Sequence, residues 1–403
     1  MVSSDRRISS AQSLDQLREY YISTKESGIP NEASSFVSRK LIHNRAIPVE
    51  SLVPEFATVQ YGESEDPIKI PSPKNKKLDD TFGEYARTYY PRKGFVCEVA
   101  DCDIVGANAT ALHNGTRPLL ETSANRISCT WIGSHYGILS HAIQSHVGLR
   151  PKSHKNRLFP MVCPDPSYFH WVIEYLPKLR WYEQYCDRAG NDPPILIEQS
   201  PRSFVIDSIE HLGISTDQWI EWDGEASTVE TLLIPNHRQH RFNKHDRPYT
   251  DYDPSKKSLT WLRDRAISNV SSETVKSPPT RIYISRQNAD RGRRITNHDE
   301  VVSLLKSVGF EEVVLEQLRF DQQVKLFSEA EMVVGAHGAG LSNIVFSQDT
   351  AVLELFPETV VRPHFYCLAH ILDLRYDSLV TEAIGNNLVV DSERLEDAVK
   401  RLQ

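Results

Sequence analysis

Apolar runs and amphipathic stretches alternate along the second half of the chain. Short apolar runs, typical of buried strands, occupy residues 281–285, 312–315, 332–334 and 350–357. Apolar residues at helical spacing occupy residues 258–268, 299–308, 320–329 and 392–402. Because strands that alternate with helices usually form a parallel sheet with crossover helices, this half predicts a Rossmann-like unit. We expect the last helix, 392–402, to cross back onto the preceding half of the chain.

The first half carries a weaker version of the same alternation. Strands are predicted at 158–163, 194–198, 219–222 and 229–235, and helices at 168–185 and 204–212. Before them, residues 94–121 alternate in polarity around His113-Asn114-Gly115, a turn sequence typical of hairpins. The first half therefore predicts a small antiparallel β-meander followed by a second α/β region.

These patterns divide the chain into four parts. Residues 1–93 form an N-terminal extension and connector, with a short helix at 13–21 and a stretch rich in Pro, Lys and Asp at 67–80. Residues 94–248 hold the meander and an acceptor-side Rossmann-like domain, residues 249–380 a ligand-binding Rossmann-like domain, and residues 381–403 the C-terminal helix. The basic stretch 236–256 reads as an inter-domain loop. The predicted fold is α/β, with two Rossmann-like units that face each other across a cleft.

A glycine-rich turn after one strand is the most informative motif. Met332-Val-Val334 leads into Gly335-Ala-His337-Gly338-Ala339-Gly340, and then into residues that can begin a helix. Glycines allow a ligand to approach the backbone closely, and the N–H groups of a helix N-terminus attract anions. The spacing is not that of a dinucleotide fingerprint, and no phosphate-loop Lys follows. A turn whose glycines serve packing alone is the alternative, but packing does not require His337.

Two further residues lie at strand ends, where α/β proteins bind ligands. Arg286 follows Ser285 at the end of the strand 281–285, and its guanidinium can hold two phosphate oxygens. Glu354 lies near the end of the strand 350–357 and could bond ribose hydroxyls or cap a neighbouring loop. From the charge run after Arg286 we select Arg294 alone as a ligand contact, because most such runs are solvated.

His170 and Glu174 are four residues apart in a predicted helix. This spacing places an imidazole and a carboxylate on one helical face, within reach of each other. Such a pair can act as a general base, with either member as the base and the other orienting it. A surface pair without a chemical role is the alternative.

Composition excludes several classes of protein. The formal charge of −8 is spread along the chain and does not indicate a nucleic-acid-binding protein. No run of eighteen apolar residues is present, and no secretion signal is readable at the N-terminus. The six cysteines are scattered without metal-ligand spacing, so we expect reduced thiols and no metal site.

Four motifs in order resemble glycosyltransferase family 61. They are Phe169-His-Trp-Val-Ile-Glu174-Tyr-Leu-Pro177, Tyr283-Ile-Ser-Arg286, His337-Gly-Ala-Gly-Leu341 and Glu354-Leu-Phe-Pro357. The family includes plant xylan arabinosyl- and xylosyltransferases, animal O-linked N-acetylglucosaminyltransferases and bacterial polysaccharide enzymes. The resemblance covers roughly residues 94–380. Trp171 and Glu174 make the first motif more similar to that of bacterial members, since plant members usually have Asp at the position of Glu174.

The resemblance implies an inverting, metal-independent glycosyltransferase of the two-domain GT-B type. It implies donor binding by Ser285, Arg286, Arg294, His337, Gly338, Ala339, Gly340 and Glu354, and catalysis by His170 and Glu174. No cofactor is expected. The expected partners are a UDP-linked nucleotide sugar and a glycan or glycolipid acceptor, in the cytoplasm or at the inner face of the membrane. A non-catalytic nucleotide- or glycan-binding protein, or a Rossmann oxidoreductase, remains the alternative.

Overall fold

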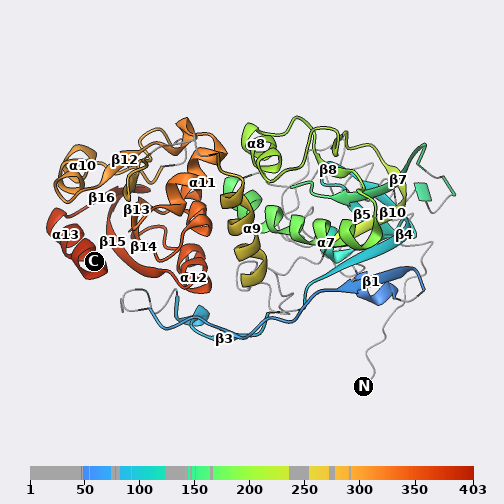
Figure 1. The fold of residues 1–403 in the computed structure, drawn as a ribbon, viewed down its shortest axis with the longest axis horizontal. Helices are drawn as coiled ribbons and strands as arrows, with labels where there is room; N and C mark the ends of the chain where they lie inside the picture. Colours follow the sequence, from blue (N-terminus) through green and yellow to red (C-terminus); the bar gives the residue numbers. More distant parts are fainter. Residues whose placement is uncertain are drawn as a thin grey trace, which may run out of the picture. The chain divides into compact units, whose positions relative to one another are not determined.

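The structure is a computed structural model, and it describes most of the chain from residue 47 onwards (Figure 1). The described residues are 47, 49–53, 55–73, 78, 82–91, 93–123, 141, 144, 145, 148, 149, 151–163, 167–235, 254–271, 277–289 and 292–403. Three predictions lie outside them: the helix at 13–21, the structure of the basic stretch 236–253, and parts of the 67–80 connector.

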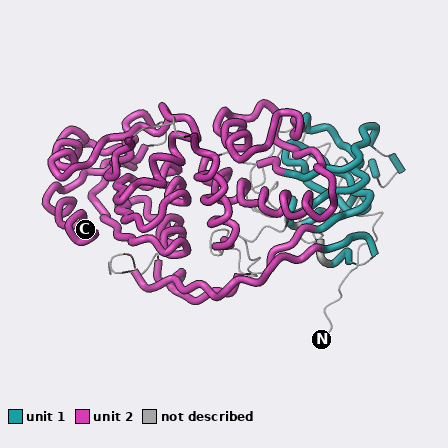
Figure 2. Tube along the Cα trace, viewed as in Figure 1, with its two compact units in different colours: residues 1–59, 97–160, 222–234 teal, residues 60–96, 161–221, 235–403 magenta. Residues whose placement is uncertain are grey.

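The described chain divides into two compact units, which Figure 2 shows in different colours. Unit 1 comprises residues 1–59, 97–160 and 222–234, and unit 2 comprises residues 60–96, 161–221 and 235–403. Residues 161–221, which include the predicted helix with His170 and Glu174, therefore belong to the same unit as the glycine-rich turn. The predicted domain boundaries at 93, 248 and 380 remain predictions.

Unit 1 is built on an antiparallel meander that continues into a parallel pair. β4 (Phe95–Val105), β5 (Thr110–His113) and β6 (Arg117–Pro118) pair antiparallel, and β10 (Ser227–Pro235) pairs parallel with β7 (Ser153–Pro160). The order of these strands is β6-β5-β4-β10-β7. Asn114 and Gly115 have φ values of 51° and 66°, which a tight hairpin turn requires. The predicted meander is confirmed.

Unit 2 contains a mostly parallel six-stranded sheet. Its strands are β11 (Arg281–Ile284), β12 (Glu311–Val313), β13 (Met332–Ala336), β14 (Ala351–Pro357), β15 (Arg375–Ile384) and β16 (Asn387–Val389). They follow the order β12-β11-β13-β14-β15-β16, in which only the β15–β16 pair is antiparallel. The predicted parallel α/β arrangement of this half is confirmed.

Helices cover both faces of this sheet (Figure 1). α10 (His298–Ser307) and α13 (Ser392–Leu402) pack on one face, where residues such as Val301 and Val399 meet Met332, Val334 and Leu353. α11 (Phe320–Ser328) and α12 (His364–Ile371) contact the 3₁₀ helix η10 (Ala339–Phe346), which follows the glycine-rich turn. Because side chains alternate along a strand, Val333, His337 and Glu354 face away from the α10–α13 layer.

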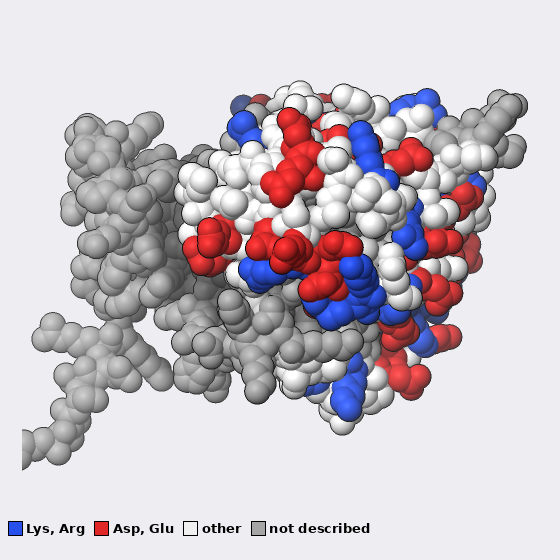
Figure 3. Space-filling model, turned by 90° about the vertical axis from the view of Figure 1, so that its left-hand side faces the viewer, with Lys and Arg blue, Asp and Glu red and all other residues white. Residues whose placement is uncertain are grey.

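The C-terminal helix corrects one prediction. We expected residues 392–402 to cross back onto the preceding half, but α13 packs on β14, β15 and α10 of its own sheet. Its buried residues Leu395, Val399 and Leu402 complete the core on that face. The outer face is charged, and acidic and basic side chains are interspersed on the side of the molecule that Figure 3 shows. Lys400–Glu396 at 2.6 Å and Arg401–Asp377 at 2.9 Å are two of its ion pairs.

The predicted helix 168–185 is a composite of four helical segments of three types. α6 (Tyr168–His170) continues as the π-helical turn η7 (Trp171–Tyr175), the 3₁₀ turn η8 (Leu176–Lys178) and α7 (Leu179–Ala189). In the π turn, the N–H of Leu176 donates to the carbonyl of Trp171, five residues earlier. Pro177 has no N–H to continue an α-helical ladder, so the helix changes pitch around it.

The remaining strands and helices agree with the sequence patterns within a few residues. They are β8 (Ile195–Glu198), β9 (Trp219–Trp222), α8 (Ser203–His211) and α9 (Lys256–Ser268). Outside these patterns, the N-terminal part contributes β1 (Ala57–Tyr61), β2 (Ile68–Lys69) and β3 (Thr88–Tyr89). No element was predicted between residues 358 and 391, where α12, β15 and β16 lie. Among the described residues, no helix is long and apolar enough to cross a membrane.

Candidate active site

The strand order places Arg286 and His337 at the point where the order of the strands along the chain changes direction. β12 lies on one side of β11, whereas β13, the next strand along the chain, lies on the other side. In such sheets, ligands bind beyond the carboxyl ends of the two strands that flank the reversal. Arg286 follows β11 and His337 follows β13, and Ile284 pairs with Gly335 between them. Two motifs about fifty residues apart therefore meet at one sheet edge.

Gly338 makes room for the Arg286 guanidinium. A Cβ atom added at Gly338 would lie 1.9 Å from Arg286 Nη1, which is far too close. The backbone of Gly338 is extended, with φ 176°, so glycine is required here for space rather than for conformation. Gly340 has a packing role, because a Cβ there would lie 2.8 Å from Leu315 Cδ1. At both positions the missing side chain leaves space for another side chain, and approach of a ligand to the glycine backbone stays a prediction.

Among the described residues, Arg286 makes no ion pair with a carboxylate, although the charge of Glu316 acts on it. Its Nε atom is buried and has no hydrogen-bond partner among the described residues, and its Nη2 lies 3.5 Å from the carbonyl of Gly292. Burial, with a contribution from nearby Arg293, lowers the pKa of Arg286 to about 10, so the side chain is still charged at neutral pH. A charged, partly desolvated guanidinium with unused donors is a ready site for an anion such as a phosphate.

His337 is the first member of a buried chain of three polar groups. Its Nδ1 lies 2.5 Å from Glu354 Oε1, and the Tyr376 hydroxyl donates to Glu354 Oε2 over 2.6 Å. The side chain of His337 is 8% exposed and that of Glu354 is 0% exposed. Glu354 was predicted to contact the donor, with loop capping as the alternative. In the structure both of its oxygens contact protein groups, and its role at the donor stays a prediction.

Burial determines the protonation states of His337 and Glu354. It lowers the pKa of His337 to about 3, and the neighbouring guanidinium groups of Arg293 and Arg286 act in the same direction. Burial also raises the pKa of Glu354 well above its usual value. The favoured state is therefore a neutral pair in which the protonated Glu354 carboxyl donates a hydrogen bond to His337 Nδ1. The single N–H proton of the neutral His337 ring is then on Nε2, which makes Nε2 a hydrogen-bond donor.

The predicted His170–Glu174 pair is present. His170 Nδ1 lies 2.9 Å from Glu174 Oε1, and the two side chains are 26% and 6% exposed. Ser167 caps the start of this helical stretch by accepting a hydrogen bond from the N–H of His170. The turn that contains Glu174 is the π turn, a feature that is frequent at functional sites. The pairing is thus confirmed, and its catalytic role stays a prediction.

Tyr168 connects this pair to the glycine-rich turn. Its hydroxyl donates to Asn343 Oδ1 over 2.7 Å, and Asn343 Nδ2 donates to the carbonyl of Gly340 over 3.1 Å. Asn343 Nδ2 also donates to Gln323 Oε1 over 2.9 Å. Side chains from α6, η10 and α11 therefore share one polar network. The network holds the start of the composite helix against the turn that carries His337.

His364, at the start of α12, lies between the two histidine–carboxylate pairs. Its ring centroid is 6.1 Å from that of His337 and 5.3 Å from that of Phe169. Burial lowers the pKa of His364 to about 3, and His337 and Arg362 act in the same direction. The sequence analysis did not select this residue. The signal was present, because Arg362-Pro363-His364 follows the end of a parallel strand, where ligand-binding residues concentrate.

Arg294 and its neighbour Arg293 lie in different surroundings, and the predicted ligand contact of Arg294 stays a prediction. Arg294 is exposed, and its Nε donates to the carbonyl of Ala289 over 3.0 Å. Arg293, with φ 61°, is the arginine whose charge acts on Arg286, His337 and Glu354. The adjacent Gly292, with φ 71°, allows this sharp turn. Sequence patterns could not distinguish neighbouring arginines, because the direction of each side chain depends on these two backbone conformations.

Ser285, Ala339 and Lys178 complete the surroundings of the site. Ser285 is buried, and its N–H donates to the carbonyl of Val313, whereas Ala339 begins η10 and is half-buried. Lys178 is buried one turn beyond Glu174, and its Nζ lies 3.7 Å from the centre of the Tyr175 ring. Burial lowers the pKa of Lys178 to about 8, and the negative groups of Cys163 and Glu174 partly oppose this shift. Within the described part of the chain, no three His, Cys, Asp or Glu side chains converge as a metal site would require.

Comparison with known proteins agrees with this geometry. Residues 168–353 match the family model described as Glycosyltransferase 61. This segment begins two residues before His170 and ends one residue before Glu354, so it contains both the composite helix and the glycine-rich turn. His364 and Tyr376 lie beyond it.

Three curated proteins illustrate the similarity. A beta-1,2-xylosyltransferase of Oryza sativa subsp. japonica is 34% identical over 21% of this chain and 15% of its own length. An EGF domain-specific O-linked N-acetylglucosamine transferase of Gallus gallus is 32% identical over 21% of this chain and 17% of its own. An alpha-1,3-arabinosyltransferase of the same rice is 30% identical over 33% of this chain and 23% of its own. The matches thus span less than a quarter of each of these relatives.

A solved structure is also similar, but only weakly. The dodecameric iron-containing heptosyltransferase TibC, in complex with ADP-D-beta-D-heptose, is 12% identical and covers 51% of this chain and 60% of its own, with a TM-score of 0.26. A score this low carries no argument about the fold. The family match, the four motifs and the three curated proteins agree that residues 168–353 are similar to the glycosyltransferase 61 family.

Proposed function

We propose that the protein transfers a sugar from a nucleotide-sugar donor, expected to be UDP-linked, to a glycan acceptor, with inversion and without a metal ion. The observation that carries the proposal is that three groups lie around the glycine-rich turn and His364: two follow β11 and β13, and the third is on the composite helix, which contacts η10. They are the desolvated Arg286 guanidinium, the neutral His337 held by Glu354, and the His170–Glu174 pair. The first two suit an anion, and the third suits an acceptor hydroxyl.

The donor diphosphate would bind beyond the ends of β11 and β13. Arg286 would donate to its oxygens, and Arg293 would add positive charge nearby. His337 Nε2 would donate a further hydrogen bond, and the first N–H groups of η10, which have no acceptor inside that helix, would add others. Negative charge grows on the diphosphate as the sugar leaves, so these donors would stabilise the transition state more than the bound donor.

The His170–Glu174 pair would act on the acceptor. One member removes the proton from an acceptor hydroxyl while that oxygen forms a bond to the anomeric carbon of the sugar. The bond from this carbon to the diphosphate oxygen breaks, and the nucleoside diphosphate leaves with the electron pair. Attack from the face opposite the leaving group inverts the anomeric configuration. Either His170 or Glu174 can be the base.

The proposal extends to architecture and location. Two Rossmann-like domains, 94–248 and 249–380, would face each other across the cleft, as in other GT-B enzymes. Support comes from the parallel β7–β10 pair and from the parallel sheet of unit 2. The reaction would take place in the cytoplasm, at the inner face of a membrane that carries a glycan or glycolipid acceptor.

Release of nucleoside diphosphate tests the proposal. We expect the wild-type protein to hydrolyse one member of a panel of UDP-, GDP- and CMP-linked sugars slowly, and to do so equally well in EDTA. Arg286→Ala should weaken binding of the corresponding nucleotide by about 1.5–3 kcal/mol in calorimetry. The exposed Arg188→Ala is the matched control and should bind normally. Binding without any release would indicate a non-catalytic protein, and activity that returns only with added manganese would contradict the metal-free mechanism.

A further inference from the structure

A concave site lies in unit 2, near the opposite end of α12 from His364. It is a pocket of about 920 Å³ between α7, α9, the segment 65–69 and the C-terminal end of α12. Its size is within the range of pockets that bind small molecules or a few sugar rings. None of the residues assigned above to donor binding or catalysis lines it.

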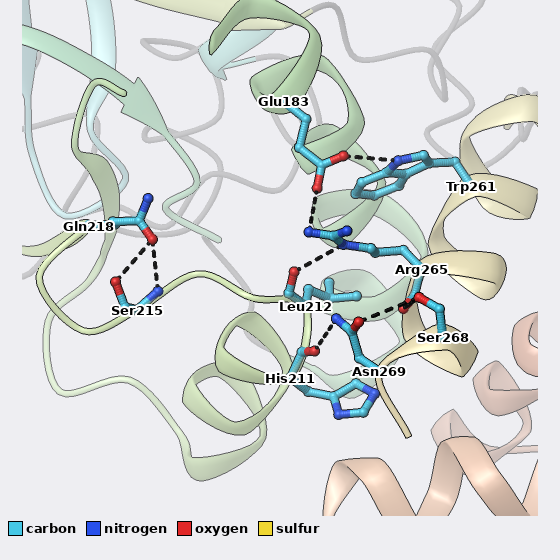
Figure 4. A network of polar contacts seen from close by, with 9 residues as sticks. All are labelled: Glu183, His211, Leu212, Ser215, Gln218, Trp261, Arg265, Ser268 and Asn269. Atoms are coloured by element: carbon cyan, nitrogen blue, oxygen red, sulfur yellow. Dashed lines mark hydrogen bonds and ion pairs between the residues drawn. The ribbon is translucent and has the colours of Figure 1, made fainter. Parts of the chain in front are cut away.

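The aromatic wall of this pocket is held in place before any ligand binds. Trp261 of α9 is half-buried, and its Nε1 donates to Glu183 Oε2 over 3.2 Å (Figure 4). The other oxygen of Glu183 lies 3.3 Å from Arg265 Nη2, and Arg265 Nε donates to the carbonyl of Leu212 over 3.3 Å. The indole therefore has a fixed orientation, which reduces the entropy cost of placing a ligand against it.

Most charged groups around the pocket already have partners. Lys256 pairs with Asp373, and Lys257 pairs with Glu63. Glu65 accepts hydrogen bonds from the Ser255 hydroxyl and from the N–H of Lys257, and so caps the start of α9. These pairs hold the walls together and leave no strong net attraction for an ionic ligand.

Arg180 of α7 differs from these groups. It is half-buried, and burial lowers the pKa of its guanidinium although the negative charge of Glu63 opposes this shift. The described residues provide no hydrogen bond or ion pair to this guanidinium, which lies 5.4 Å from the ring of Trp181. Its donors are therefore available on the same pocket surface as Trp261.

The pocket and the candidate active site share two structural elements. α12 carries His364 at one end and the pocket residue His370 at the other, six residues or about 9 Å along the helix. The composite helix carries Glu174 and, six residues later, Arg180. A ligand of two or three sugar rings that occupies the pocket could therefore reach the His170–Glu174 pair.

We propose that this pocket is the acceptor subsite and that it binds an oligosaccharide, with one sugar ring against the Trp261 indole and its oxygens bonded by Arg180. The proposal rests on the function proposed above. A sugar ring presents a C–H face to an aromatic surface and hydroxyl oxygens around its edge. A fixed indole next to an unused guanidinium matches both features, and the mutual pairing of the other charges favours a largely uncharged glycan.

Glycan binding by the full chain tests the assignment. The probe is a printed array of neutral oligosaccharides that includes xylose- and N-acetylglucosamine-containing chains. We expect Arg180→Ala and Trp261→Ala each to weaken retention of the glycan that the wild type binds by at least about tenfold, as for loss of one charge-assisted bond. Tyr90→Ala is the control, because Tyr90 is an aromatic residue that is 67% exposed and lies outside the pocket.

A second measurement separates this proposal from the proposed function. Release of nucleoside diphosphate from the donor without acceptor should change less than about twofold in both pocket variants, which also shows that they are folded. Undiminished glycan retention in both variants, or no retention by the wild type, would overturn the pocket assignment and leave the transferase proposal intact. Glycan retention that needs Trp261, without any donor turnover by the wild type, would instead overturn the transferase and with it the acceptor role.

Discussion

Two histidine–carboxylate pairs form the candidate site, and they are built in opposite ways. His170 and Glu174 are neighbours in sequence, lie on a helical turn and are 26% and 6% exposed. His337 and Glu354 come from adjacent parallel strands and are 8% and 0% exposed, with Tyr376 behind the carboxylate. A pair that water reaches can exchange protons with a substrate. A pair sealed from water keeps its proton, so it fixes the tautomer and orientation of one donor. In the proposed function, the first pair would therefore transfer the proton and the second would provide electrostatic stabilisation.

The largest expected effect comes from removing the basicity of the first pair. Glu174→Gln keeps the shape of the side chain, and if Glu174 is the base, turnover should fall by roughly 100- to 10,000-fold at every pH. If His170 is the base, His170→Asn should show this loss and Glu174→Gln should keep partial activity. Nucleotide affinity, measured by calorimetry, should change little in both variants, and the exposed Glu393→Gln serves as the control. Near-normal turnover in both Glu174→Gln and His170→Asn would show that this pair has only a structural role.

The proposed donor site depends on the space that Gly338 leaves for the Arg286 guanidinium. Gly338→Ala should displace the Arg286 guanidinium, because the new Cβ would lie 1.9 Å from Nη1. We expect nucleotide affinity to fall about 10- to 100-fold, similar to Arg286→Ala, whereas the unfolding free energy should change less. Gly83→Ala is the matched control, since nothing lies within 4 Å of its added Cβ. Equal affinity in Gly338→Ala and the wild type would remove Arg286 from the donor site.

Acid stability should distinguish the sealed histidines from exposed ones. The pKa values of His337 and His364 are lowered to about 3 by burial, whereas an unfolded histidine titrates near its usual value of 6.5. As pH falls through this window the unfolded state binds protons first, so the free energy of unfolding should decrease by at most about 1.4 kcal/mol per pH unit for each histidine. Glu354 has the opposite sign, because its pKa is raised and its contribution is lost as pH rises above 4.5.

The variant His364→Gln isolates one of these histidines. Its unfolding free energy, from urea titrations between pH 4.5 and 7, should depend less steeply on pH than that of the wild type. An unchanged slope in His364→Gln would mean that the ring is hydrated rather than sealed.

The smallest expected effect concerns the hydrogen bond that links the helical turn to the glycine-rich turn. Tyr168→Phe removes the donor to Asn343 Oδ1 and leaves a part-buried acceptor with one partner fewer. We expect a loss of about 0.5–1.5 kcal/mol in the free energy of unfolding. If the bond also positions the first pair, turnover should fall while nucleotide affinity stays constant. Unchanged stability and turnover would show that packing alone holds the two turns together.

Local signals were strong enough to predict most of the sheet of unit 2 and one contact of the site. The strands 281–284, 332–336 and 351–357 read as apolar runs because each is buried on both faces. The spacing of His170 and Glu174 predicted their contact because a helical turn brings residues four apart together, and the π turn preserved it. The sequence patterns missed α12 and β15, and they could not show that the charge of Arg293 acts on Arg286 and His337, because this depends on segments that are distant in sequence.

By itself, the sequence determined the alternation of strands and helices, the glycine-rich turn and the family motifs, because these depend on neighbours within a few residues. Only the tertiary structure decided that β11 and β13 lie side by side, so that Arg286 meets the turn at Gly338. It also decided that Glu354 is enclosed by His337 and Tyr376 rather than open to a ligand, and that His364 lies between the two pairs. The physical reason is that strand order and burial arise from contacts between distant segments. Charge state follows burial, so the chemistry of these side chains could not be read from their local sequence.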